Sequence, residues 1–195
     1  MKTMIPSVIL CLGDSLTEGF GVADAHCYPH LLQQRLRAQG SGMRVINAGI
    51  SGDTTGGVLG RLEALLDHPV AMAIVTIGLN DAFMGIPVAA IRDNVAAIIQ
   101  TLQRHRIAVV LSGLQLPTDF PPDVRQGFSA IYPHLASQHG VPLIPFFQEG
   151  VFEESRYNQW DNVHPNAAGY RIILDNVWRV IQPILATFPR GDTHG

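Results

Sequence analysis

Short, nearly continuous apolar runs alternate along the chain with longer segments in which apolar residues recur every three or four positions. The short runs cover residues 8–12, 45–46, 72–77, 107–111 and 141–144. Runs without polar positions are typical of strands that are covered on both faces, as in a parallel sheet. The pattern therefore predicts five buried strands.

The longer segments have the period of amphipathic helices. Pro87 suits a first helical turn, and Gly40 suits the end of a helix. The predicted helices cover residues 28–39, 58–66, 91–102, 123–138 and 166–185. Strands that alternate with helices in this way predict an α/β fold, a three-layer sandwich in which a five-stranded parallel sheet has helices on both faces.

The composition fits one compact unit. The chain has 195 residues, of which 47% are hydrophobic and 15% charged, and we expect residues 1–195 to form a single domain. A formal charge of −3 gives no attraction to nucleic acid or to anionic membranes. No apolar segment has the length of a transmembrane helix. We therefore expect no nucleic-acid partner and no stable membrane anchoring. A monomer is the expected state, although no sequence feature reports on it.

The N-terminal segment and the cysteine content both bear on the compartment. Lys2 precedes an apolar stretch over residues 5–12, which resembles an export signal, but this stretch runs directly into Gly13-Asp14-Ser15 without room for a cleavage site. We interpret it as the first core strand. Cys11 and Cys27 are too few for a disulfide framework and are expected to be buried or bystander thiols. A cytoplasmic location is predicted, and a periplasmic or secreted one would require a longer N-terminus.

Three motifs lie where predicted strands end or where the last predicted helix begins. They are Gly13-Asp14-Ser15-Leu16, Gly78-Leu79-Asn80-Asp81 and Asp161-Asn162-Val163-His164-Pro165. In open parallel sheets, ligands bind beyond the carboxyl ends of the strands, so we expect the motifs to converge on one rim. Together they supply a nucleophile, an oxyanion donor and an acid–base pair, which are the parts of a serine hydrolase.

The candidate catalytic residues are Ser15, His164 and Asp161. A serine hydroxyl becomes a good nucleophile when a neighbouring base takes its proton, and His164 is the natural base. Asp161 lies three residues before His164, close enough in one turn to accept the imidazole N–H and fix its tautomer. Taken alone, Ser15 also fits an N-cap and the Asp161–His164 segment an ordinary surface turn. The combination of motifs favours catalysis.

An acyl-transfer site also needs donors that face the developing oxyanion. Asn80 offers a side-chain amide at the end of the third strand. Gly52 lies in a turn where the absence of a side chain lets a backbone N–H approach the substrate, although it also fits a plain turn glycine. The backbone N–H of Ser15 would be the third donor.

The motifs resemble those of the SGNH (GDSL) hydrolases, whose four blocks contribute Ser, Gly, Asn and His. The matching residues are Ser15, Gly52, Asn80 and His164, with Asp161 as the triad acid. The segments that resemble the multifunctional acyl-CoA thioesterase, lysophospholipase and arylesterase branch are residues 47–54, 128–133 and 141–147. The resemblance implies a flavodoxin-like fold, no metal, no cofactor, and hydrolysis of a small-molecule ester or thioester through an acyl-enzyme. Relatives in this branch are often exported.

Other functions stay open at this stage. Lysophospholipase or carbohydrate acetylesterase activity would use the same site. Metal-assisted phosphoester chemistry is a remote alternative, since carboxylates suit Mg²⁺, and a non-catalytic ligand-binding module is another. The carboxylates in question are Asp14, Asp53, Asp81 and Asp161. The metal hypothesis leaves Ser15, Asn80 and His164 without roles, and the first three of those aspartates also suit loop anchors that accept backbone hydrogen bonds.

The predicted rim loops cover residues 82–87, 115–122 and 146–160 and contain several apolar side chains. The candidate substrate-binding residues are Phe83, Met84, Ile86 and Phe120. An apolar wall around a few polar groups is typical of small-molecule pockets and predicts an acyl or aryl group. The alternative is that some of these side chains only pack the loops onto the sheet.

Overall fold

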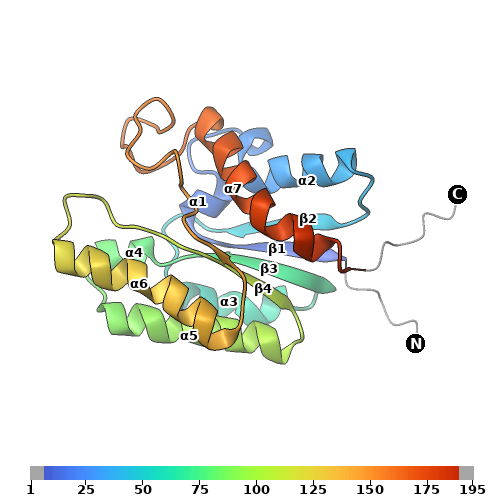
Figure 1. Ribbon diagram of the computed structural model, residues 1–195, viewed down its shortest axis with the longest axis horizontal. Coiled ribbons are helices and arrows are strands. Elements are labelled where there is room, and N and C mark those ends of the chain that lie inside the picture. Colours follow the sequence, from blue (N-terminus) through green and yellow to red (C-terminus); the bar gives the residue numbers. More distant parts are fainter. Residues whose placement is uncertain (1–6, 189–195) are drawn as a thin grey trace, which may run out of the picture.

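The computed structural model describes residues 7–188 and has a three-layer α/β architecture (Figure 1). One parallel sheet has the strand order β2-β1-β3-β4-β5. Its strands are β1 (Val8–Gly13), β2 (Arg44–Gly49), β3 (Val70–Thr76), β4 (Ala108–Ser112) and β5 (Leu143–Ile144). The predicted five-stranded parallel sheet is confirmed, and only the strand boundaries shift by a few residues.

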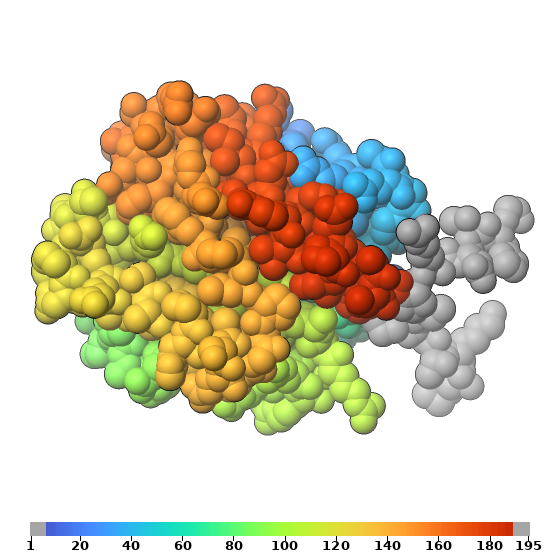
Figure 2. Space-filling view, viewed as in Figure 1, coloured from blue at the N-terminus to red at the C-terminus, as the bar shows by residue number. Residues whose placement is uncertain are grey.

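Five long helices cover the two faces of the sheet. They are α2 (Tyr28–Ala38), α3 (Thr55–Leu65), α5 (Val88–Arg104), α6 (Pro122–His139) and α7 (Ala167–Leu185). Helices α2 and α7 pack together on one face, and α3, α5 and α6 lie on the other (Figure 1). In the space-filling view, α7 and the segment that precedes it, in red and orange, cover much of the upper half of the visible face (Figure 2). The predicted helices on both faces are confirmed.

Three short helices were not predicted from the sequence. They are α1 (Ser15–Glu18), η1 (Asp24–His26) and α4 (Leu79–Phe83). The segments that directly follow β1 and β3 are therefore the starts of α1 and α4, and residues 82–83 of the predicted rim loop 82–87 belong to α4. One helical turn is too short to leave a periodic pattern, and such helices form only where tertiary contacts hold them.

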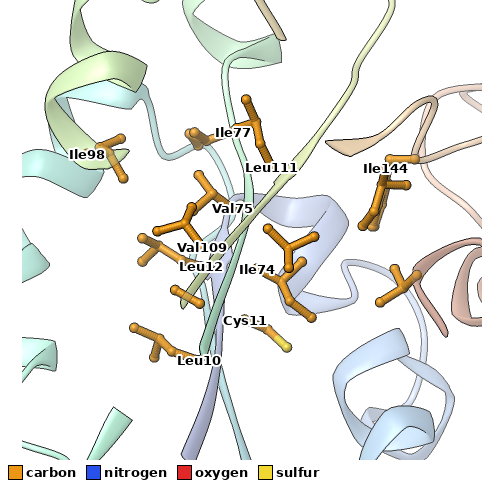
Figure 3. Packing of buried hydrophobic residues seen from close by; sticks show 14 of the residues in the cluster. Leu10, Cys11, Leu12, Ile74, Val75, Ile77, Ile98, Val109, Leu111 and Ile144 are labelled. Atoms are coloured by element: carbon orange, nitrogen blue, oxygen red, sulfur yellow. The ribbon is translucent and has the colours of Figure 1, made fainter. Parts of the chain in front are cut away.

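The core is built mainly on β1 and β3, whose residues are all buried (Figure 3). Residues 8–12 form the first core strand, whereas residues 5–6 of the same apolar stretch lie outside the described part of the chain, as do the two ends of the predicted 1–195 domain. Cys11 lies in this core, and both cysteines are buried and free, as predicted. No helix within residues 7–188 is long and apolar enough to cross a membrane.

The carboxyl ends of the central strands meet at one edge of the sheet. Gly13, the last residue of β1, pairs with Gly49 at the end of β2 and with Thr76 at the end of β3. The strand order changes direction at this point, because β2 and β3 lie on opposite sides of β1. The segments after all three strands therefore start side by side, at the position where α/β sheets bind ligands.

Candidate active site

Ser15, His164 and Asp161 lie in a single hydrogen-bonded series. Ser15 Oγ is 2.9 Å from Nε2 of His164, and Nδ1 of the same ring is 2.7 Å from Oδ2 of Asp161. The serine and the histidine are 149 residues apart in sequence, so the fold brings them together. This arrangement lets the imidazole take the serine proton while the carboxylate holds the ring.

A tight turn presents the acid and the base on one side. Oδ1 of Asp161 accepts hydrogen bonds of 2.9 Å from the backbone N–H groups of Val163 and His164. Asn162 between them has a φ of +57°, a left-handed conformation that asparagine tolerates better than most residues. The carbonyl of His164 accepts a 2.8 Å bond from the Gln159 N–H. The turn is thus held by the Asp161 carboxylate and by the bond between the Gln159 N–H and the His164 carbonyl.

Asp161 stays ionised at neutral pH. Burial opposes the charge, but the backbone N–H of His164, its ring and the backbone N–H of Val163 outweigh this effect and lower the pKa of Asp161 below its ordinary value. An ionised carboxylate at this position can stabilise the imidazolium that forms when His164 accepts a proton.

Ser15 is the first residue of α1 and is 8% exposed. Its carbonyl accepts hydrogen bonds from the Phe20 N–H at 3.1 Å and from the Tyr170 hydroxyl at 3.4 Å. The Phe20 ring also contacts the imidazole of His164, with ring centroids 4.7 Å apart. The backbone of the nucleophile is therefore fixed from two sides, and one of these contacts links it to the base.

Asp14, the residue before Ser15, is buried and borders the same cavity. Its Oδ1 accepts a 3.0 Å hydrogen bond from the Leu16 N–H and caps α1, while Oδ2 has no partner among the described residues. Burial raises the pKa of Asp14 to about 7, although the Leu16 N–H favours the ionised form. Asp14 serves as the predicted loop anchor through one oxygen only.

The three predicted oxyanion donors come from three neighbouring segments. Asn80 lies in the first turn of α4, and its Nδ2 donates a 2.8 Å bond to the carbonyl of Asp53, which follows Gly52. Gly52 has a φ of +81°. Within residues 7–188, the N–H groups of Ser15 and Gly52 donate to no other protein group. Asn80 has a second amide hydrogen, so each of the three residues can offer a donor to a ligand.

The aspartates beside these donors anchor their segments, as predicted. Asp81 is buried, and its carboxylate accepts bonds of 2.9 Å from the N–H and 2.5 Å from the hydroxyl of Thr55 at the start of α3. Asp53 accepts a 3.0 Å bond from the Thr54 N–H. These two carboxylates are thus bound to separate groups. No cluster of three metal-ligating side chains occurs in the described part of the chain.

A cavity of about 310 Å³ opens beside the Ser15 hydroxyl. Both polar and apolar side chains line it. Its lining residues are Asp14, Ser15, Leu16, Leu79, Asn80, Phe83, Asp161, Val163 and His164. Gly52 is not among them, and the residue after it, Asp53, holds Asn80 through its carbonyl. The cavity therefore combines the nucleophile, the base and one candidate oxyanion donor with a surface suited to an apolar group.

Only one of the four predicted substrate-binding residues lines this cavity. Phe83 does so with a half-exposed ring. The side chain of Met84 is 65% exposed, and that of Ile86 packs against the core. Phe120 packs edge-to-face on Phe83, with ring centroids 5.5 Å apart, and supports it from behind. The predicted wall is thus reduced to Phe83 at the end of α4, because Met84 directly after it is exposed and Ile86 packs against the core.

Leu16, Leu79 and Val163 line the cavity and were missed in the sequence. Each is a member of one of the three motifs, so its apolar character beside the polar site residues was the available signal. Arg61 was also missed. It appears in the sequence as a lone arginine within the amphipathic pattern of α3, and its contacts become visible only in the structure.

Comparisons with known proteins agree with this geometry. Residues 11–172 match the GDSL-like lipase/acylhydrolase family. Esterase TesA of Pseudomonas aeruginosa is 37% identical over 178 residues, which cover 91% of this chain and 89% of the relative. Thioesterase 1/protease 1/lysophospholipase L1 of Escherichia coli K12 is 34% identical over 178 residues, which cover 91% of this chain and 84% of that protein. The resemblance to the thioesterase and lysophospholipase branch is thus confirmed.

A solved structure supports the same assignment. The crystal structure of TesA matches with a TM-score of 0.88 at 36% identity, over 91% of this chain and 99% of that one. The chain belongs to the GDSL-like lipase/acylhydrolase family.

Proposed function

We propose that this protein hydrolyses carboxylic esters and thioesters through an acyl-enzyme on Ser15. The observation that carries the proposal is the series of hydrogen bonds from Ser15 through His164 to Asp161 at the wall of a cavity. Family membership supports it, as do the names of two relatives, an esterase and a thioesterase/lysophospholipase.

In the acylation step, Nε2 of His164 takes the hydroxyl proton while Ser15 Oγ bonds to the carbonyl carbon of the ester. The carbonyl π electrons move to its oxygen and form a tetrahedral oxyanion. When this intermediate collapses, the bond to the alcohol oxygen or thiol sulfur breaks, and His164 returns its proton to that atom. Asp161 keeps the ring oriented through both transfers.

The oxyanion requires donors that are already in place when the charge develops. The Ser15 N–H, the Gly52 N–H and the second hydrogen of Asn80 Nδ2 are the proposed three. Their support is that the two backbone groups donate to no other protein group within residues 7–188 and that Asn80 is held from one side by Asp53. A donor fixed in advance loses no energy to reorganisation during the reaction.

In the deacylation step, His164 takes a proton from a water molecule, and the resulting hydroxide attacks the acyl carbon. The same donors stabilise the second oxyanion. Its collapse breaks the bond between the acyl carbon and Ser15 Oγ, which takes the proton back from His164. A carboxylic acid leaves, and the free enzyme is restored.

We propose apolar acyl or aryl esters as the substrates. Four apolar side chains line the cavity, and the exposed large hydrophobic residues of the described chain all lie within five positions of a proposed site residue. These exposed residues are Phe20, Ile50, Phe83, Met84 and Trp160. Such a concentration of exposed apolar surface marks a ligand or interaction site.

The test is hydrolysis by purified protein of p-nitrophenyl esters from acetyl to palmitoyl, alongside acyl-CoA thioesters and lysophosphatidylcholine. We expect turnover of several apolar esters, and the relative rates decide among esterase, thioesterase and lysophospholipase activity. A Ser15→Ala protein serves as the control. Turnover that survives in this variant on every substrate would exclude the proposed mechanism.

A further inference from the structure

Arg61 in α3 binds three different segments with one guanidinium group. Its Nε donates a 2.8 Å hydrogen bond to Oδ2 of Asp53. Its Nη2 donates to the carbonyl of Gly13 at 3.1 Å and to the carbonyl of Ala48 at 2.8 Å. The Arg61 side chain is only 21% exposed. A partly buried guanidinium with these partners is a rigid connection rather than a surface ion pair.

Each acceptor belongs to a segment that carries one proposed oxyanion donor. Gly13 lies two residues before Ser15 at the end of β1. Ala48 lies at the end of β2, directly before the turn that contains Gly52. Asp53 follows Gly52, and its carbonyl holds Asn80 Nδ2 at 2.8 Å. Arg61 therefore touches the supports of all three donors without lining the cavity itself.

We propose that Arg61 is the positioning residue of the oxyanion hole, an inference that rests on the proposed esterase mechanism. The three donors come from segments that are far apart in sequence, so their relative positions depend on contacts between the segments. The planar guanidinium offers several donors in a fixed geometry, which suits it to setting such positions. Its pairing with Asp53 also satisfies both charges where water has little access.

The segments have other links, which define what Arg61 adds. The Gly13 carbonyl also accepts a 3.1 Å bond from the Ile50 N–H, and Glu18 accepts a 2.9 Å bond from the Ser51 N–H. These contacts hold the turn before Gly52 onto β1 and α1. The backbone N–H of Asp53 also donates to the carbonyl of Ile50 at 3.0 Å. What Arg61 adds is a link from the Asp53 carboxylate to the ends of β1 and β2, next to the Asp53 carbonyl that holds Asn80.

The experiment compares kcat and KM of wild type, Arg61→Met and Arg61→Lys on one p-nitrophenyl ester. Titration with a p-nitrophenyl phosphonate gives the concentration of competent sites, so an unfolded fraction does not enter kcat. We expect Arg61→Met to lower kcat about tenfold or more with little change in KM, because donor placement acts on the transition state. Arg61→Lys should fall between, since one ammonium group cannot keep all three contacts.

Arg35→Met is the matched control. Arg35 pairs with Asp175 at 2.7 Å on the surface between α2 and α7, away from the cavity, and its side chain is 31% exposed. This variant loses the same charge and should keep wild-type kcat. If Arg35→Met lowered kcat as much as Arg61→Met, loss of charge rather than position would explain the effect and the inference would be overturned.

A double-mutant cycle with Asn80→Ala separates positioning from stability. If Arg61 acts in part through Asn80, Arg61→Met should lower kcat several-fold less in the Asn80→Ala background than in wild type. Two results would refute the positioning role. In the first, the losses in kcat from the two substitutions multiply. In the second, Arg61→Met lowers the melting temperature but keeps the wild-type kcat per titrated site. The proposed mechanism is tested separately by Ser15→Ala, so the two failures are distinguishable.

Discussion

Asp161 binds both the backbone and the ring of His164. Its Oδ1 accepts from the His164 N–H at 2.9 Å while its Oδ2 lies 2.7 Å from Nδ1 of the ring. One carboxylate thus closes the turn that carries the base and also selects the tautomer of that base. The structure of the turn and the chemistry of the site depend on the same two oxygens.

Ser15→Ala and His164→Ala should each remove nearly all ester hydrolysis and leave the fold intact. Both residues act in one proton-transfer unit, so the double variant should be hardly worse than either single one. Asp161→Asn should be milder or at worst similar, because Oδ1 can still close the turn while an amide replaces the acceptor at Nδ1. The measurement is kcat/KM on one ester with circular dichroism for the fold. Losses that multiply in the double variant would contradict a shared step.

Asn80→Ala should lower kcat about a hundredfold or more with little change in KM, as expected for the loss of an oxyanion donor. Asn80→Asp should be worse, because it places negative charge where negative charge develops. Steady-state kinetics on a short ester measure both effects. A correctly folded Asn80→Ala protein with unchanged kcat would remove this residue from the oxyanion hole.

Asn162 has a φ of +57° between the acid and the base. Asn162→Gly should keep kcat within a few-fold, because glycine adopts this conformation without strain. Asn162→Val should cost about 1–2 kcal/mol of unfolding free energy and lower kcat, since a β-branched residue resists the left-handed region and the turn must shift. Melting curves and kcat on the two variants provide the comparison. Equal kcat in both would show that the turn geometry does not matter for catalysis.

The raised pKa of Asp14 predicts that the free energy of unfolding depends on pH. Burial raises the pKa of Asp14 to about 7, so the folded protein holds this proton more tightly than the unfolded chain. The free energy of unfolding should therefore fall as pH rises from about 4 to about 7. Asp14→Asn keeps an acceptor for the Leu16 N–H and should flatten this fall, gaining at most about 4 kcal/mol over wild type near pH 8. Urea unfolding across the pH range tests it, with the exposed Asp93→Asn as control. Parallel pH curves for wild type and Asp14→Asn would contradict the raised pKa.

The sheet and the long helices could be predicted because buried strands appear in the sequence as continuous apolar runs and helices as apolar residues at every third or fourth position. All residues of β1 and β3 are buried, and α5 and α7 each keep one apolar face against the sheet. β2, at the edge of the sheet, includes exposed polar positions, and only residues 45–46 were recognised. The predicted site residues were also placed correctly relative to the strand ends, since the ends of parallel strands share one edge.

The features that the sequence did not predict depend on contacts between residues that are far apart in the chain. α4 is one turn long and is held by the bond between Asp81 and Thr55, 26 residues away in sequence. The orientation of this short helix decides that Phe83 faces the cavity and Met84 does not. The partners of Arg61 include a carbonyl that lies 48 residues earlier. A single sequence cannot reveal such pairings, because each depends on the completed fold.

Phe83 gives the last prediction, which concerns acyl-chain preference. Its ring lines the cavity beside Ser15 and contacts the ring of Phe120, whereas Met84, the residue directly after α4, is 65% exposed and does not line the cavity. If Phe83 forms the wall for the acyl chain, longer chains should gain about 0.8 kcal/mol per buried CH₂ until the cavity is full. Phe83→Ser should therefore lower kcat/KM selectively for medium-chain esters and leave acetate esters nearly unchanged.

Met84→Ser is the control at the neighbouring position and should keep the wild-type chain-length profile. Ile86→Ser, which removes a side chain packed against the core, should instead lower the melting temperature without changing that profile. Series of p-nitrophenyl esters from acetyl to dodecanoyl on the three variants, with melting curves, compare these outcomes. A parallel drop for acetyl and octanoyl esters in Phe83→Ser would mean that the ring positions the catalytic groups or supports the fold. The acyl chain would then have to lie along another part of the cavity, and Leu79 and Val163 would be the next residues to replace.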